Sequence, residues 1–233
     1  KNNINIICNC KVVAIDRNNK TILLENLKNI GYEKLVITTG SVVNKLKTSS
    51  REVNLYYLRT IKDSLKIRER LRNKNKIAII GAGYIGLEIA SIAIKKNLKV
   101  CVLELENRVM GRVVSPEVSH FFQKKHQSEG VEFKFNTSVT DIEDLGKYKR
   151  IICSDGSVLN TDFVVVGVGI KPNVELAQSS GLECNNGIIV DEIGQTSDHH
   201  IFAVGDCSNH PNNIFKCRLR LESVQNAVEQ AKS

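Results

Sequence analysis

The chain has 233 residues, of which 42% are hydrophobic and 25% are charged, and this composition is ordinary for a globular protein with a sizeable core. No apolar run approaches the ~20 residues of a membrane-spanning helix. The net charge of +8 is spread along a chain with 5% aromatic residues and no nucleic-acid-binding motif. We therefore expect no membrane span and no nucleic-acid partner.

The seven cysteines contain no Cys-x-x-Cys pair and no zinc-ligand spacing. Several lie in apolar, strand-like runs, where a free cysteine behaves as a small hydrophobic side chain. Cys8 and Cys10 are too close together, in too strand-like a stretch, to indicate a redox or metal pair. An odd number of cysteines without a disulfide framework indicates a reducing compartment. From the cysteines we therefore expect a cytoplasmic protein without a metal site, and no signal peptide is visible.

The N-terminal third predicts short strands followed by one helix. Two strand-like runs, 11–16 and 21–25, flank a polar turn at 16–19, which is a hairpin signal. A short apolar strand is expected at 35–38, and the polar stretch after it predicts a loop up to about residue 53. Apolar residues at helical spacing then predict a helix over 60–73.

The most informative stretch follows, where an apolar strand opens into the Gly-x-Gly-x-x-Gly pattern of Gly81, Gly83 and Gly86. In a dinucleotide-binding unit these glycines provide the tight turn, the close backbone approach to a pyrophosphate and the close helix packing. The N–H groups at the helix start attract phosphates. A second strand, 99–103, ends on Glu104, 23 residues after Gly81, where a carboxylate can bind ribose hydroxyls. This context favours a dinucleotide site over a glycine-rich turn without a ligand.

The rest of the chain continues to alternate strands and helices. Ser115-Pro116 predicts a helix start, with Pro116 at the first helical position, and the helix should end near Gly130. A final helix is predicted over 219–232. Further strands are predicted at 131–135, 150–153, 162–166, 188–190 and 201–204.

The order of these motifs resembles the pyridine nucleotide-disulfide oxidoreductase superfamily. Within it, the closing run Arg220–Ala227 is the most discriminating and resembles the FAD-dependent ferredoxin and rubredoxin reductases that serve P450s and aromatic-ring dioxygenases. The resemblance extends from about residue 3 to residue 232. The other matching segments are Leu58–Thr60, Gly81–Glu88, Gln195–Asp198 and Ala203–Cys207.

The resemblance implies an α/β fold of the glutathione-reductase type. A Rossmann-like NAD-binding domain, 57–171, would be inserted into an FAD-binding domain formed by 1–56 and 172–233. Members of the family begin with a separate glycine-rich loop for the ADP half of FAD and end with a C-terminal interface domain. We find neither here, so we expect an internal fragment with a partial FAD-binding domain. By itself the fragment should bind FAD poorly and show little reductase activity.

Residue roles are also implied by the resemblance. Glu88 matches a glutamate that pairs, in the superfamily, with a lysine beside the flavin N5, and we expect it to be the catalytic residue. Tyr84 and Ile85 could instead pack the helix start, and the roles of Arg108 and Arg112 stay open between phosphate contact and solvent exposure. Positions matching FAD contacts are Val12, Thr39, Gly40, Arg59, Gly205, Asp206 and Val224. Positions matching the NADH site are Gly81, Gly83, Tyr84, Ile85, Gly86, Glu104 and Gly169.

The implied activity is that of an NADH-dependent flavoprotein that transfers electrons through FAD to a [2Fe–2S] ferredoxin or a rubredoxin. The basic cluster of Lys216, Arg218 and Arg220 could steer an acidic acceptor. The alternatives are that these charges are solvated, or that Arg220 has a structural role. One alternative is an NAD(P)H-dependent disulfide reductase of the same superfamily. Another is a non-enzymatic NADH sensor like apoptosis-inducing factor, distinguished by slow turnover and redox-linked dimerisation. The acceptor and the oligomeric state, monomer or homodimer, stay open.

Overall fold

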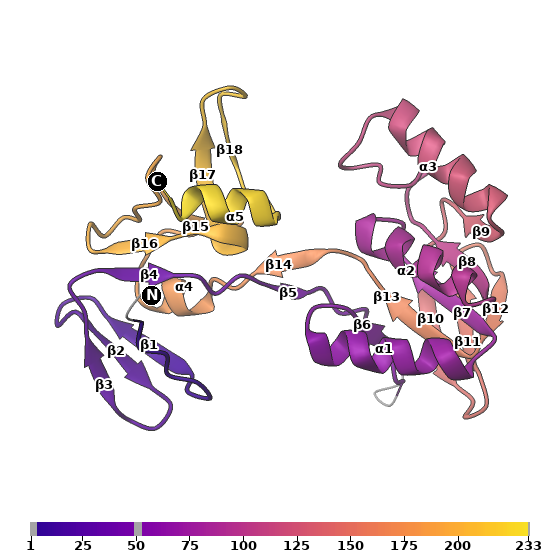
Figure 1. Ribbon diagram of the computed structural model, residues 1–233, viewed down its shortest axis with the longest axis horizontal. Coiled ribbons are helices and arrows are strands. Elements are labelled where there is room, and N and C mark those ends of the chain that lie inside the picture. Colours follow the sequence, from indigo (N-terminus) through magenta and orange to yellow (C-terminus); the bar gives the residue numbers. More distant parts are fainter. Residues whose placement is uncertain (1–3, 49–52, 233) are drawn as a thin grey trace. The chain divides into compact units, whose positions relative to one another are not determined.

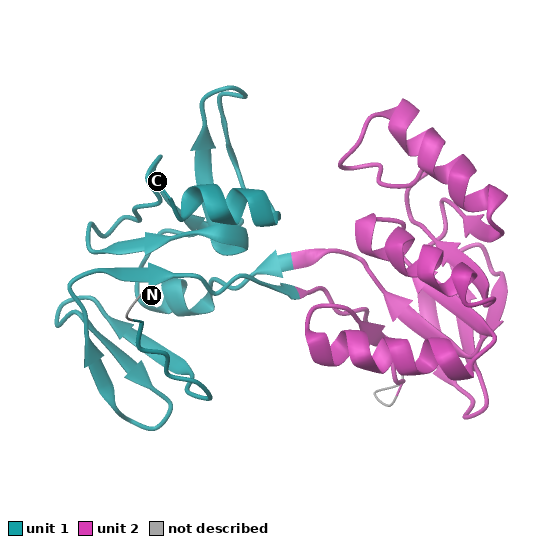
Figure 2. Ribbon diagram, viewed as in Figure 1, with its two compact units in different colours: residues 1–42, 171–233 teal, residues 43–170 magenta. Residues whose placement is uncertain are grey.

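The computed structural model describes residues 4–48 and 53–232. They form two compact units, one from residues up to 42 together with residues from 171 onward, and the other from residues 43–170 (Figure 2). The chain passes between the units on two strands, β5 (Ser41–Val43) and β14 (Ile170–Pro172), which pair with each other (Figure 1). The predicted α/β class is confirmed, because a parallel sheet with helices forms the larger unit.

The unit of residues 43–170 is built on a five-stranded parallel sheet. Its central strands are buried along almost their whole length, because both faces of the sheet are covered. The strands, in spatial order, are β6 (Tyr56–Tyr57), β13 (Phe163–Val166), β7 (Lys76–Ile80), β8 (Lys99–Leu103) and β9 (Val131–Lys134).

Alternate side chains of β7 enter two different cores, as the two-residue period of a strand requires. Ile77 and Ile79 join the core that contains buried residues of the helices, whereas Ala78 and Ile80 join the core that contains Ile142 and Ile151. The helices that contribute buried residues to this core are α1 (Ile61–Asn73) and α2 (Tyr84–Lys95), and the third helix of the unit is α3 (Pro116–Ser128). The antiparallel strands of the second core are β10 (Val139–Asp144), β11 (Lys149–Cys153) and β12 (Val158–Thr161).

The other unit joins the two ends of the described chain. Its core brings Ile37 of the N-terminal part against Ile188 and Ile201 of the C-terminal part. An antiparallel sheet contains β1 (Val12–Asp16), β2 (Thr21–Leu24) and β3 (Asn29–Gly31). The parallel pairs are β4 (Leu35–Ile37) with β16 (Ile201–Ala203) and β15 (Ile188–Ile189) with β17 (Ser208–Asn212), and β17 forms a hairpin with β18 (Cys217–Leu219). The helical segments are α4 (Glu175–Ser179), the 3₁₀ turn η1 (Gly205–Cys207) and α5 (Val224–Gln230).

Two predictions of secondary structure were wrong. The final helix starts at Val224 instead of Leu219, because residues 217–219 pair with β17 and the Ser223 side chain caps the helix by accepting from the Asn226 N–H at 3.1 Å. The predicted loop after residue 38 contains strand β5. Within the described ranges, no helix combines the length and the hydrophobicity that crossing a membrane requires.

Candidate functional site

The predicted dinucleotide loop joins β7 to α2, and two of its glycines are required by packing. Gly81 has φ +99°, and a Cβ on it would lie 2.4 Å from the Gly167 carbonyl oxygen. A Cβ on Gly86 would lie 2.1 Å from the carbonyl oxygen of Gly81. Both distances are too short for a real side chain, so these glycines let the loop and α2 lie directly against the strand ends.

Gly83 is different, because a Cβ on it would meet no described atom within 4 Å. It is the N-cap of α2 and provides no side-chain cap, and the first turn of the helix contains no acidic residue. The N–H groups at this end of the helix are therefore left for an outside acceptor. The open space beside Gly83 is what the predicted close approach of a pyrophosphate needs.

Glu104 directly follows β8, and its carboxylate is hydrogen-bonded to the glycine loop. Oε2 accepts from the Ala82 N–H at 2.6 Å, and Oε1 accepts from the Glu106 N–H at 2.9 Å. The backbone of Glu104 is held as well, since its N–H donates to Lys134 and its carbonyl accepts from Thr137. A negative charge is thus fixed beside the glycine loop, as a ribose-binding carboxylate requires.

Tyr84, Ile85 and Glu88 project from the exposed face of α2. Tyr84 is 57% exposed, so more than half of its surface is open, whereas Ile85 is 39% exposed and mostly covered. Glu88 lies one turn further along the helix on the same face. It is exposed, and no described residue forms a hydrogen bond or an ion pair with it.

Gly169 lies just after β13 with φ +92°, and the Asn44 N–H donates to its carbonyl oxygen at 3.0 Å. The guanidinium of Arg112 is close, because its Nη2 is 3.7 Å from the position of a Cβ on Gly169. Sequence reasoning missed Asn44. Arg108, in contrast, donates to two carbonyl oxygens of its own loop.

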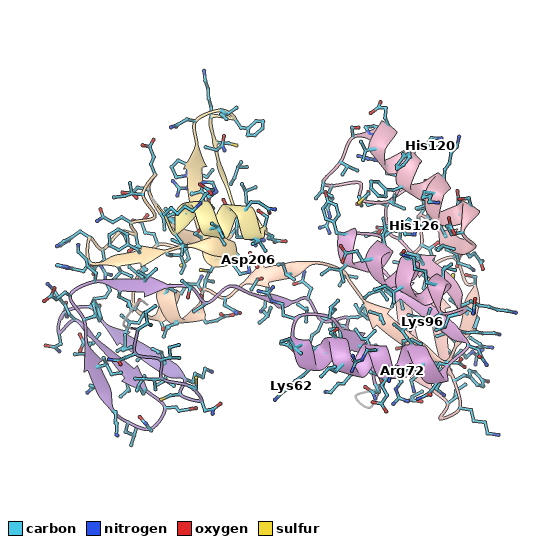
Figure 3. The ribbon with its side chains drawn as sticks, viewed as in Figure 1. Lys62, Arg72, Lys96, His120, His126 and Asp206 are labelled. Carbon is cyan, nitrogen blue, oxygen red and sulfur yellow. The ribbon has the colours of Figure 1, made fainter. Side chains whose placement is uncertain are left out.

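Asp206 is held in the unit formed by the two chain ends, in η1 directly after β16 (Figure 3). Its Oδ2 accepts from the Ser41 hydroxyl at 2.9 Å. The neighbouring Gly205 has φ +79° and donates its N–H to Gln230 of α5 at 2.8 Å. Val224 begins α5 and is 77% exposed. The structure thus brings Gly205 and Asp206 against α5, the helix that Val224 begins.

Thr39 and Gly40 follow β4 and are tied to Asn173. The Thr39 hydroxyl donates to the Asn173 carbonyl at 2.7 Å, and the Asn173 side chain donates to the Thr39 carbonyl at 2.9 Å. Thr39 and Val12 both line a largely apolar groove of about 930 Å³ within this unit. Ser41 and Asn173 were not predicted from the sequence, although Ser41 directly follows the predicted Thr39-Gly40.

Arg59 belongs to the unit of residues 43–170, where it precedes the N-cap of α1. Its side chain is exposed, and its backbone N–H donates to Asp63 at 3.3 Å. Asp63 also completes a capping box with Thr60. The predicted FAD positions are therefore divided between the two units, with Arg59 in one and the other six in the other.

The basic cluster before α5 is largely tied up within the fold. Arg218 donates to the carbonyl oxygens of Val190 and Asn209. Arg220 forms an ion pair with Glu222 at 2.7 Å, and its side chain is only 9% exposed. These contacts favour the structural alternative for Arg220 and add a structural role for Arg218, whereas Lys216 is exposed at the turn of the β17–β18 hairpin.

Comparison with known proteins shows which family and which relatives the chain resembles. Residues 1–231 match the family described as pyridine nucleotide-disulphide oxidoreductase. The chain is 40% identical to putidaredoxin reductase of Pseudomonas putida, over 99% of this chain and 56% of the relative. It is 36% identical to a rubredoxin-NAD(+) reductase of the same organism, over 99% of this chain and 60% of the relative.

The fold is also shared with solved structures. A ferredoxin reductase from Rhodopseudomonas palustris superposes with a TM-score of 0.91 at 42% identity, covering 96% of this chain and 56% of that chain. The chain therefore spans somewhat more than half the length of the proteins that it resembles.

Proposed function

The chain belongs to the pyridine nucleotide-disulphide oxidoreductase family, and we propose that it serves to pass electrons from NADH through FAD to a ferredoxin or a rubredoxin. One observation carries the proposal: the Glu104 carboxylate is hydrogen-bonded to the glycine loop, beside the open space at Gly83. This is the arrangement that binds the ribose and the pyrophosphate of a dinucleotide. The names of the relatives support the acceptor class.

The residues around the loop fit NADH. The N–H groups at the start of α2 would bind the pyrophosphate, and Glu104 would accept from the ribose hydroxyls. The exposed side chains of Tyr84 and Ile85 would contact the nicotinamide half, and Gly169 would line the same site. Because Glu104 is negatively charged, it would repel the 2′-phosphate of NADPH.

The residues of the other unit fit FAD. Asp206 would accept from the hydroxyls of the ribityl chain, beside Gly205, and the N–H of Val224 at the start of α5 would face the ring. Val12 and Thr39 would contribute from the groove that they line, with Gly40 next to them. Arg59 would bind a phosphate.

When bound, FAD supplies the change from a two-electron hydride donor to a one-electron acceptor. The residues of this chain would bind and orient the two cofactors, and Glu88 would place a negative charge beside them. Glu88, exposed on α2 without a described partner, would pair with a cation beside the flavin, so that a substitution there should affect catalysis more than NADH binding.

The partner would be a small acidic electron carrier, and the oxygenase that it serves a P450 or a dioxygenase. Of the three basic residues before α5, Lys216 is the one left for steering this carrier. All seven cysteines are free thiols, which supports a reducing, cytoplasmic location. We propose a monomer or a homodimer.

The test is NADH-dependent reduction of cytochrome c through an added [2Fe–2S] ferredoxin or rubredoxin, by the complete FAD-loaded enzyme that contains this chain. The rate should depend on the added carrier, and it should survive alkylation of the thiols. A reaction without the carrier is the control. Loss of all activity on alkylation, together with reduction of a disulfide substrate, would assign the protein to the disulfide reductases instead.

A further inference from the structure

The loop between β8 and α3 is attached to the glycine loop at its middle. Met110 is buried with φ +50°, and its N–H donates to the carbonyl oxygen of Ala82 at 2.9 Å. The preceding Val109 has no exposed surface, and its carbonyl accepts from the buried Ser119 hydroxyl at 2.6 Å. The shape of this loop is therefore coupled to the loop that is predicted to bind the dinucleotide.

The Arg108 side chain bridges two carbonyl groups in the second half of the loop. Its Nη2 donates to the Gly111 carbonyl at 2.6 Å, and its Nη1 donates to the Val114 carbonyl at 3.0 Å. The two bonds use the rigid fork of the guanidinium to hold two carbonyl groups three residues apart. A lysine has a single ammonium on a flexible stem and cannot reproduce this geometry.

Arg112 lies between Gly111 and Val114, the two residues whose carbonyls Arg108 binds, but its own side chain has a different environment. It forms no hydrogen bond or ion pair with any described residue, and its side chain is exposed. Its Nη2 nevertheless lies near Gly169, 3.7 Å from the position of a Cβ there. A guanidinium held at this place can donate to a phosphate.

We propose that Arg108 is a positioning residue for the dinucleotide site: by joining the carbonyls of Gly111 and Val114 it keeps Arg112 at Gly169, where Arg112 meets the pyrophosphate. The inference rests on the proposed function. It assigns a different role to each of the two arginines, whose roles the sequence leaves open. Arg108 acts through Arg112 and does not itself touch the ligand.

The test is calorimetric titration with NAD+ of the wild-type chain and of Arg108→Ala, Arg108→Lys, Arg112→Ala and the Arg108→Ala/Arg112→Ala double variant. Arg112→Ala should weaken binding roughly tenfold, the size expected for one hydrogen bond to a charged group. Arg108→Ala and Arg108→Lys should each weaken it by a similar factor. The double variant should be little weaker than either single variant, because Arg108 works through Arg112. Arg72→Ala removes an exposed charge from α1 and should leave the affinity unchanged (Figure 3).

Losses that multiply in the double variant would overturn the proposal, since Arg108 would then act independently of Arg112. Wild-type affinity in Arg108→Lys would overturn it too, because the charge alone would be sufficient. Thermal melting of each variant shows whether the fold is retained, and Arg108→Lys preserves the charge and the aliphatic stem if Arg108→Ala unfolds. A wild-type chain that binds no NAD+ would contradict the proposed function as well, whereas unchanged affinity in the Arg108 variants contradicts this inference alone.

Discussion

Replacing Gly83 and Gly86 by alanine should separate the binding role of the glycine loop from its packing role. The two residues are three positions apart, Gly83 at the N-cap and Gly86 in the first turn of α2, yet their surroundings are opposite. At Gly83 an added Cβ meets no described atom within 4 Å, whereas at Gly86 it would be 2.1 Å from a backbone oxygen. The same methyl group therefore tests two different properties of the site.

The expected magnitudes follow from these surroundings. Gly83→Ala weakens the N-cap of α2 but reduces the entropy of the unfolded chain, and the two effects, each about 0.5–1 kcal/mol, largely cancel. In Gly86→Ala the helix must move by nearly an ångström to bring the contact from 2.1 Å to the 3.0 Å that real Cβ atoms keep. Overpacking of this kind costs about 1–3 kcal/mol, which for a chain of this size lowers the melting temperature by roughly 2–12 °C.

Thermal melting and NAD+ titration of both variants are the assays. Gly83→Ala should melt within about 2 °C of the wild type while binding NAD+ roughly 10- to 100-fold more weakly, because the methyl group occupies the space beside the pyrophosphate. Gly86→Ala should lose both stability and binding. Wild-type affinity in Gly83→Ala would refute the assignment of the pyrophosphate to this loop. An unchanged melting temperature in Gly86→Ala would refute the packing argument.

Three further predictions concern charge. Glu104→Gln should reduce the preference for NADH over NADPH at least roughly tenfold in kcat/KM, because the repulsion of the 2′-phosphate disappears; an unchanged ratio would assign the preference elsewhere. Reduction of a ferredoxin should slow as ionic strength rises, and Lys216→Gln should lessen this dependence, whereas Lys96→Gln should not; equal slopes in all three proteins would contradict steering through Lys216. The Arg17 guanidinium, 2.9 Å from Asp198, lowers the pKa of that carboxyl below its ordinary 3.8, so its stabilisation is present above pH 3.8 and is lost as the pH falls through the lowered pKa. In urea unfolding the wild type should therefore have a larger free energy of unfolding than Asp198→Asn. This difference should be full at about pH 7 and shrink below about pH 4, and a difference independent of pH would contradict the reasoning.

The dinucleotide unit could be predicted from sequence because its signals are local. Strand, glycine loop, helix and second strand follow one another within about thirty residues, and each has its own pattern of apolar or small residues. The contact between Glu104 and Ala82 spans only 22 positions, and the strand–helix–strand order brings the two together. The helices α1 and α3 were predicted from local signals as well: α1 from its apolar residues at helical spacing and α3 from its N-cap Ser115.

The hairpin of β17 and β18 had no such local signal. Its first strand contains Asn209, Pro211 and Asn212, residue types that are depleted in strands, and in the described part of the chain β18 pairs only with β17. From the sequence, the basic cluster of Lys216, Arg218 and Arg220 stayed open between steering an acceptor, being solvated and, for Arg220, a structural role. Whether an arginine is free depends on carbonyl groups elsewhere: those that bind Arg218 lie 28 and 9 positions away. The charges of side chains can be counted in a sequence, but the carbonyl groups that accept their hydrogen bonds cannot be identified there.

The predicted FAD positions depend on contacts of still longer range. Ser41 and Asp206 are 165 positions apart, and Thr39 and Asn173 are 134 apart, because the whole unit of residues 43–170 is inserted between them. No periodicity in the chain can indicate such pairs, so these positions could be proposed only from resemblance. The Ser41 hydroxyl shows the physical consequence: it occupies one lone pair of Asp206 Oδ2 and orients the carboxylate. A residue that neither pattern nor resemblance singled out therefore controls the geometry of one that resemblance did, and Ser41→Ala should disturb flavin affinity without removing any predicted contact.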